Sequence, residues 1–209
     1  MSDTRARLLA AAAATLRDEG IAGLSARTVA ARAEVNQALI FYHYKTLPGL
    51  VDAAVRTSVE DSVASYRARF AAVGSLVELL RVGRELHERE RSLGNVAMMA
   101  QLLAGAQRDP VLAGAARHAM TRWNAEIEAV VRRVLAGSPL AEIADPAGTA
   151  AAISAGFLGL ELYEGVDAAG ATAALDALER LGALVEVVDD LGPVARRALR
   201  AKVRRLGRP

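Results

Sequence analysis

The run Val35-Asn36-Gln37-Ala38-Leu39-Ile40-Phe41-Tyr42-His43-Tyr44-Lys45-Thr46 decides the fold. Asn36 is a residue type that caps helices, and it opens a helical pattern over roughly residues 37–44. Another cap type, Ser25, opens the preceding helix, which runs to about Ala33 and leaves a tight turn between the two. An earlier helix covers residues 4–19 and ends at Gly20. Three short helices, the second and third joined by a tight turn, are the helix-turn-helix arrangement, whose third helix enters the DNA major groove.

The third of these helices has the side chains that such a role requires. Gln37 stands at its start, where its amide can bond both donor and acceptor of an adenine. Tyr42, His43 and Lys45 place a hydroxyl, an imidazole and an ammonium at its other end, where they can hold phosphates. The neighbouring rings of Phe41 and Tyr44 fit two interpretations equally well: contact with DNA, or packing of the small domain onto the next helix.

Composition restricts the class of protein. The chain has 209 residues, of which 53% are hydrophobic and 24% charged, as in a globular protein with a real core. The absence of cysteine excludes disulfides, cysteine-ligated metal and thiol catalysis. Aromatic residues make up 4% while strong helix formers dominate, so we expect an all-α protein. No apolar run reaches the length of a membrane span, and we expect a cytoplasmic protein that holds no metal or cofactor.

Glycine and proline divide the rest of the chain into further helical patterns. They predict about nine to ten helices in total, with the later ones near residues 48–72, 75–91, 95–108, 110–137, 146–165, 171–191 and from 193 onward. Three cap signals support these starts: Ser75 with Glu78, Asp109 before Pro110, and Asp145 before Pro146.

The N-terminal quarter of the chain resembles the tetracycline-repressor (TetR) family. The resemblance lies in Thr4-Arg5 before an alanine-rich helix, Gly23-Leu24-Ser25, Val29-Ala30, the run from Val35 to Thr46, and Leu50. It implies a homodimeric helical repressor with an N-terminal DNA-binding domain and a divergent C-terminal domain that binds a small effector and dimerises. On this basis we expect a helix-turn-helix domain over residues 1–47 and a ligand-binding and dimerisation domain over residues 48–209.

The resemblance also implies roles for individual residues. Arg27 and Gln37 would face the bases, with Ala38 or Leu39 against a thymine methyl. The remaining DNA-contacting residues would hold the phosphate backbone: Thr4, Ser25, Ala26, Tyr42, His43 and Lys45.

Four positions depart from the family pattern. Glu34 replaces the usual turn glycine, so a left-handed backbone there would cost about 1 kcal/mol and place a negative charge near DNA. Ala38 replaces a glycine, and Phe41 lacks the hydroxyl of the usual tyrosine. Leu47 replaces a phosphate-binding lysine, so we expect a modest affinity for non-specific DNA.

The second half of the chain supplies candidates for an effector site. Methionine and tryptophan suit an adaptable apolar cavity with a few polar anchors. The apolar candidates are Met98, Met99, Leu102, Leu103, Trp123, Phe157 and Tyr163. The candidate anchors are Gln101, His118, Asn124 and Glu161. These residues favour a mid-sized hydrophobic ligand, and a cationic ligand would require Glu161 or Glu164 inside the protein.

The helices near 146–165 and 171–191 are apolar on more than one face, which requires burial on both sides. A second subunit explains the additional burial, through a four-helix interface. The predicted interface stripe consists of Ile153, Phe157, Leu160, Leu175, Leu178, Gly182 and Val185, with Leu158, Leu162, Leu181, Leu184 and Val188 on a second stripe. The alternative is a core that lies entirely within one chain.

Two other functions stay open at this stage. Residues 57–191 carry a net charge of −7, whereas residues 192–209 carry +7 with no acidic residue. A helical interaction protein could therefore bind nucleic acid through this basic tail, although a solvated face of a last helix explains the charge as well. An all-helical enzyme is the remaining alternative, but we expect no catalytic residues, because the three histidines are far apart and no nucleophile or phosphate-loop motif occurs.

Overall fold

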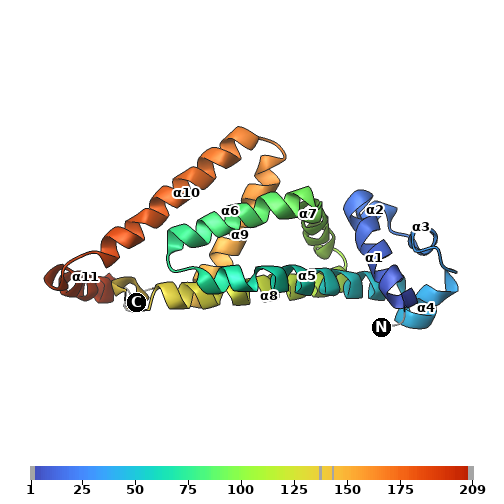
Figure 1. Cartoon of the computed structure of the whole chain (residues 1–209), viewed down its shortest axis with the longest axis horizontal. Helices are drawn as coiled ribbons and strands as arrows, with labels where there is room; N and C mark the ends of the chain where they lie inside the picture. Colours follow the sequence, from blue (N-terminus) through green and yellow to red (C-terminus); the bar gives the residue numbers. More distant parts are fainter. Residues whose placement is uncertain (1–2, 137, 143, 207–209) are drawn as a thin grey trace. The chain divides into compact units, whose positions relative to one another are not determined.

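A computed structural model describes residues 3–136, 138–142 and 144–206, and this part of the chain contains α-helices, one 3-10 helix and no strand. The helices are α1 (Asp3–Asp18), α2 (Gly20–Gly23), α3 (Ala26–Arg32), α4 (Ala38–Tyr44), α5 (Leu47–Ala72), α6 (Leu76–Ser92), α7 (Asn95–Ala106), α8 (Pro110–Val134), η1 (Pro139–Glu142), α9 (Pro146–Glu164), α10 (Ala168–Asp189) and α11 (Pro193–Leu206) (Figure 1). The expected all-α fold class is confirmed.

The described residues form two compact units. Unit 1 contains residues 3–65 and 88–122, and unit 2 contains residues 66–87 and 123–206. Helices α5, α6 and α8 each continue from one unit into the other. Each unit has its own core, and they are described separately below.

The core of unit 1 is formed by the N-terminal helices. One face of α1 buries Leu8, Ala12 and Leu16, and the small alanines of that face allow α3 to pack closely against it. Ile40 of α4 and Leu50 of α5 are completely buried in the same cluster. The helix-turn-helix segment is therefore anchored to α1 and α5 by aliphatic side chains.

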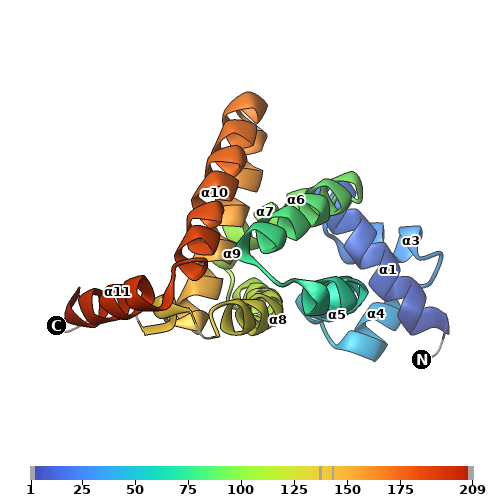
Figure 2. The ribbon, with the colours of Figure 1, turned by 60° about the vertical axis from the view of Figure 1, so that its left-hand side comes forward.

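The core of unit 2 is built around aromatic residues. Tyr66 and Phe70 of α5 pack against Trp123 of α8, with ring centroids 6.2 and 6.3 Å apart. Aliphatic residues of α6 and α8 complete this cluster, and Ile153 of α9 packs against it. Helices α9 and α10 are joined by a short turn and lie against each other (Figures 1 and 2).

The predicted cap residues begin the helices as expected. Ser25 accepts a hydrogen bond from the backbone N–H of Thr28 at 3.0 Å, and Asn36 accepts one from Ala38 at 2.8 Å. Asp145 accepts from Ala147 and Gly148 at the start of α9. These bonds satisfy backbone donors that have no partner inside a helix.

Two elements were not expected from the sequence. The first helix stops at Gly20, as predicted, and Gly20 has a left-handed backbone (φ 70°), but Gly20–Gly23 form the separate short helix α2. The other unexpected element is the 3-10 helix η1. Among the described helices, none is both long and apolar enough to cross a membrane.

Candidate nucleic-acid interface

The turn between α3 and α4 has the strained backbone that the sequence suggested. Glu34 adopts a left-handed conformation, with φ 52°. Arg7 of α1 supports it, because the Nη2 group donates hydrogen bonds to the carbonyl oxygens of Ala33 at 2.5 Å and Glu34 at 3.0 Å. The same nitrogen lies 3.6 Å from the Glu34 carboxylate. Arg7 thus neutralises part of the negative charge and satisfies two carbonyls of the turn.

Helix α4 has one buried and one exposed side. Ile40 is completely buried, whereas Gln37, Ala38 and Tyr42 are exposed, Tyr42 to 72%. Gln37 makes no capping hydrogen bond with its side chain. Leu39 packs against the core, so of the two candidates for a thymine contact only Ala38 lies on the surface. An exposed row that begins with an amide and ends with a phenol is suited to a base edge and a flanking phosphate.

The aromatic residues at the end of α4 have different environments. Tyr44 packs against the core of unit 1, its hydroxyl donates to the Arg5 carbonyl at 3.3 Å, and the Arg5 guanidinium lies 5.4 Å from its ring centroid. Phe41 is 45% exposed. The His43 ring contacts Tyr42 edge to face, with centroids 4.9 Å apart. Tyr44 therefore fastens α4 to α1, and Phe41 is the one of the two left available for contact.

The other predicted phosphate contacts lie around the same surface. Lys45 caps α4 with a positive φ of 68° and is exposed. Ser25 and Arg27 are exposed at the start of α3, while Ala26 and Thr4 are partly buried. Leu47, at the position of the missing lysine, packs against the core.

The seven predicted effector residues do not fall in one unit. Met98, Met99, Leu102 and Leu103 lie on α7 in unit 1, where Met98 and Leu102 are buried. Trp123, Phe157 and Tyr163 lie in unit 2. There Trp123 packs in the aromatic core, and Tyr163 is 47% exposed and donates a hydrogen bond to Asp167 at 3.1 Å. The Gly170 N–H and the Tyr163 hydroxyl both stabilise the charged form of Asp167 and lower the pKa of its carboxyl.

The predicted anchor Glu161 belongs to a polar cluster inside unit 2. His87 of α6 is buried, and its Nδ1 and Nε2 atoms lie 3.2 Å from Glu161 and 2.6 Å from Glu164 of α9. Both carboxylates that a cationic ligand would need are thus inside unit 2, engaged with this imidazole. Asn124 has a buried Oδ1.

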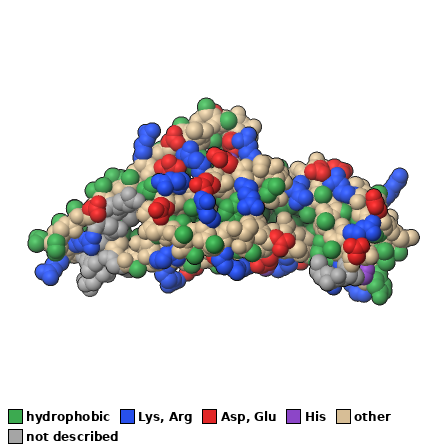
Figure 3. Space-filling model, viewed as in Figure 1, with side chains coloured by type: hydrophobic (Ala, Val, Ile, Leu, Met, Phe, Trp, Pro, Cys, Tyr) green, Lys and Arg blue, Asp and Glu red, His purple; other side chains and the backbone are tan. Residues whose placement is uncertain are grey.

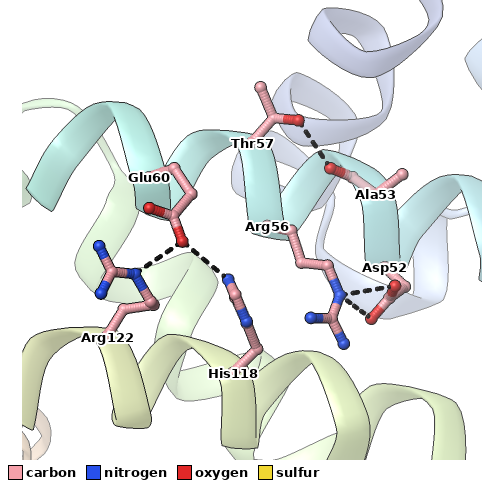
Figure 4. Close-up of polar contacts among 7 residues, drawn as sticks. All are labelled: Asp52, Ala53, Arg56, Thr57, Glu60, His118 and Arg122. Carbon is pink, nitrogen blue, oxygen red and sulfur yellow. Dashed lines mark hydrogen bonds and ion pairs between the residues drawn. The ribbon is translucent and has the colours of Figure 1, made fainter. Parts of the chain in front are cut away.

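The anchor His118 belongs to a network that joins α5 and α8 within unit 1. Glu60 of α5 accepts hydrogen bonds from His118 Nε2 at 3.1 Å and from Arg122 Nε at 2.7 Å (Figure 4). One turn earlier on α5, Arg56 donates to both carboxylate oxygens of Asp52. The hydrogen bond from Arg122 stabilises the charged carboxylate and lowers the pKa of Glu60 below its ordinary value of 4.5.

The predicted dimer stripe is packed largely inside unit 2. Ile153 contacts the aromatic core, and Phe157 packs on Gly83, where a Cβ would lie 3.0 Å from its ring. Gly182 faces α6, and a Cβ there would lie 3.1 Å from Leu80. Leu160 and Leu175 are partly buried, Leu178 is exposed, and the Val185 side chain is outside the described residues.

The second apolar stripe of α9 and α10 is the exposed one. Leu162, Leu181 and Leu184 are 54%, 58% and 58% exposed. Hydrophobic side chains are visible along the outer edge of α10 in Figure 3. In the single chain, these three leucines are more exposed than most of the residues of the predicted interface stripe.

Sequence reasoning missed two contacts of unit 1. Arg7 was not considered, although a basic residue on α1 was the available signal. Gln101 was proposed as an effector anchor, yet its Oε1 accepts a hydrogen bond from the backbone N–H of Ile21 at 3.0 Å. Among the described residues, no group of His, Asp and Glu side chains is arranged to hold a metal ion.

Comparisons with known proteins agree with this geometry. Residues 8–54 match the family model "Bacterial regulatory proteins, tetR family". No curated protein matches the sequence. A structure described as a TetR-family transcriptional regulator from Rhodococcus sp. is 26% identical with a TM-score of 0.70, and the match covers 90% of this chain and 99% of that one.

Two further solved structures are similar. A TetR-family member from Streptomyces coelicolor A3 is 29% identical with a TM-score of 0.62, over 85% of this chain and 97% of that one. The multidrug binding protein EbrR, complexed with imidazole, is 29% identical with a TM-score of 0.63, over 87% of this chain and 90% of that one.

Proposed function

We propose that this chain, which belongs through its N-terminal domain to the TetR family of transcriptional regulators, is a sequence-specific repressor that a small effector releases from DNA. The observation that carries the proposal is the exposed row on α4. Gln37, Ala38 and Tyr42 are exposed on a helix that Ile40 fixes to the core. Gln37 and Arg27 are the proposed base-reading residues, and Tyr42, His43 and Lys45 the proposed phosphate contacts.

The proposed active form is a homodimer. Leu162, Leu181 and Leu184 form an exposed apolar stripe on two adjacent helices, and burial against a second copy would remove it from water. A two-fold dimer carries two copies of α4, so we expect an operator with two half-sites in inverted orientation.

The proposed effector is a small, mainly hydrophobic molecule. Support comes from the apolar residues of α7, Met98, Met99, Leu102 and Leu103, and from the similarity to EbrR, a multidrug binding protein. The assignment of DNA binding to residues 1–47 and of ligand binding and dimerisation to residues 48–209 is part of the same proposal.

The experiment is selection of bound duplexes from a random DNA pool by the purified full-length protein. We expect recovery of a near-palindromic sequence. Gln37→Ala should relax the preference for one base pair per half-site, because a bidentate base contact contributes about 1–3 kcal/mol of discrimination. Removal of residues 193–209 should leave the preference intact. Failure to enrich any sequence, or loss of preference only after removal of the tail, would overturn the proposal.

A further inference from the structure

Helix α3 ends in a hydrogen-bond pattern in which a glycine is the usual residue. The Val35 N–H donates to the Ala30 carbonyl at 3.0 Å, and the two side chains pack in the same apolar cluster. The Glu34 N–H donates to the Ala31 carbonyl at 3.1 Å. This pair of bonds closes helices whose next residue is left-handed. Here that residue is Glu34, whose Cβ makes the left-handed backbone costly.

Arg7 of α1 bonds the two carbonyls that lie at this helix end. Its Nη2 group donates to Ala33 at 2.5 Å and to Glu34 at 3.0 Å. Carbonyls at the C-terminus of a helix carry partial negative charge, which favours a guanidinium beside them. Because both carbonyls converge on one nitrogen, a change in the Glu34 backbone would break at least one of these bonds. Arg7 therefore stabilises the left-handed backbone that Glu34 itself disfavours.

The same stretch of α1 contacts the other end of α4. The Tyr44 hydroxyl donates to the Arg5 carbonyl at 3.3 Å, and the Arg5 guanidinium lies 5.4 Å from the Tyr44 ring centroid. Arg5 and Arg7 are two positions apart, so the first turns of α1 contact the chain on both sides of α4. With Tyr44 fixed at one end, the turn at Glu34 determines where Gln37 lies at the other end.

We infer that Arg7 is a positioning residue for base reading. It compensates for the missing turn glycine, because it keeps Glu34 left-handed and so sets the direction in which α4 leaves α3. Gln37 lies three residues after Glu34, at the start of α4, and Arg27 lies on α3. The relative position of these two proposed base-reading residues therefore depends on Arg7. The effect on DNA rests on the proposed function, whereas the effect on the turn does not.

The first test measures amide hydrogen exchange at Val35 in the full-length protein without DNA. Arg7→Met keeps a long unbranched side chain and removes every donor, and Arg17→Met, at the other end of α1, is the control. We expect exchange to be about 3- to 30-fold faster in Arg7→Met and unchanged in Arg17→Met. When Glu34→Gly is already present, Arg7→Met should accelerate exchange at most half as much on a logarithmic scale, because glycine adopts the left-handed backbone without support.

The second test measures affinity for the duplex recovered by selection, at several salt concentrations. Arg7→Met should bind about 3- to 30-fold more weakly, with the same base preference and the same slope of log affinity against log salt concentration. A direct phosphate contact of Arg7 would instead lower that slope by about one when the residue is replaced. In a double-mutant cycle with Glu34→Gly, the loss from Arg7→Met should be at most half as large on a logarithmic scale. Arg17→Met should bind like the wild type.

The inference is overturned if Val35 exchanges at the wild-type rate in Arg7→Met, or if the salt slope falls by about one. It is also overturned if Arg7→Met has the same effect with glutamate and with glycine at position 34. If Arg7→Met does not fold, Arg7→Lys takes its place, since a lysine lacks the guanidinium that reaches both carbonyls. If the wild type selects no DNA, the proposed function fails, and the exchange rates alone decide whether Arg7 stabilises the turn.

Discussion

Glu34 shows how one residue can be unfavourable to the backbone and still be tolerated. Its left-handed backbone (φ 52°) is a conformation that residues with a Cβ rarely adopt. Arg7 offsets the cost by bonding the carbonyls of Ala33 and Glu34. These two bonds involve backbone oxygens and do not depend on the Glu34 side chain.

Replacement of Glu34 by glycine should therefore stabilise the fold. The Arg7 bonds to the carbonyls persist, the left-handed strain disappears, and only an exposed ion pair is lost. We expect Glu34→Gly to raise the free energy of unfolding in urea by up to about 1 kcal/mol. Ala31→Gly, on the exposed side of α3, is the control and should lower it by about 1 kcal/mol. A less stable Glu34→Gly protein would show that the ion pair outweighs the strain.

The two lysines of the chain provide a matched pair for the phosphate contacts. Lys45 lies at the end of α4 and Lys202 on α11. Lys45→Ala should reduce the slope of log affinity against log salt concentration by about one, because one fewer counterion is released from DNA. Lys202→Ala should leave the slope unchanged, as measured by fluorescence anisotropy at several salt concentrations. The reverse result would assign nucleic-acid binding to the basic tail.

At the scale of single residues, interactions between near neighbours in the sequence could be predicted, whereas contacts between residues far apart in the sequence could not. The caps at Ser25 and Asp145 follow from residue types within a few positions of each other, and the left-handed backbone at Glu34 was expected from the resemblance to the TetR family. The contacts of Arg7 with Glu34 and of Gln101 with Ile21 join residues 27 and 80 positions apart. Their existence depends on tertiary packing that no local pattern encodes.

At the scale of elements, the hydrogen bonds of Glu60 link α5 to α8 in unit 1, and the stability that this link contributes should depend on pH. Glu60 is held in its charged form by Arg122 and His118, which lowers its pKa below 4.5. The unfolded chain therefore takes up this proton at higher pH than the folded chain. The stability that the link contributes is fully present above about pH 4.5 and is lost as the pH falls through the lower value of the folded state.

Urea unfolding of Glu60→Gln over a pH series checks this behaviour. The variant should be less stable than the wild type above about pH 4.5, and the difference should decrease towards zero below it. Asp61→Asn, at the exposed next position of α5, is the control and should not show this pattern. A difference that is constant with pH would exclude ionisation of Glu60 as its cause.

Most helices could be predicted because glycine, proline and cap residues mark their ends. Helix α2 was missed because four residues are too few for a periodic pattern. The orientation of α9 and α10 was also beyond the sequence. Both have two apolar stripes, and only the packing of Phe157 on Gly83 and of Gly182 on Leu80 shows which stripe faces inward.

At the scale of the whole molecule, the exposed leucines of α10 predict the oligomeric state. Leu181→Glu combined with Leu184→Glu should convert a dimer into a folded monomer, because both side chains are 58% exposed in the single chain and a buried carboxylate would oppose association. Light scattering coupled to size exclusion measures the mass. Val194→Glu, at an 81% exposed position of α11, should remain dimeric. A wild-type protein that is monomeric at micromolar concentration would contradict the proposed dimer.

The fold class was predictable from composition and from the helix-turn-helix spacing, but the division into units was not. The sequence suggests a boundary after residue 47, where the helix-turn-helix motif ends. The structure groups residues 88–122 with the helix-turn-helix segment. The physical cause is the set of contacts between α7 and the helices α1 and α2, which include the Gln101 bond to Ile21.

This grouping matters for anyone who recombines such regulators. A chimera that exchanges only the first 47 residues would place a foreign α2 against Gln101 and Gly105 of α7. The new helix-turn-helix domain would then pack poorly on α7. An exchange that transplants residues 88–122 together with the reader would preserve the fit. The unit to be moved between regulators is thus discontinuous in the gene, and a single crossover cannot transfer it.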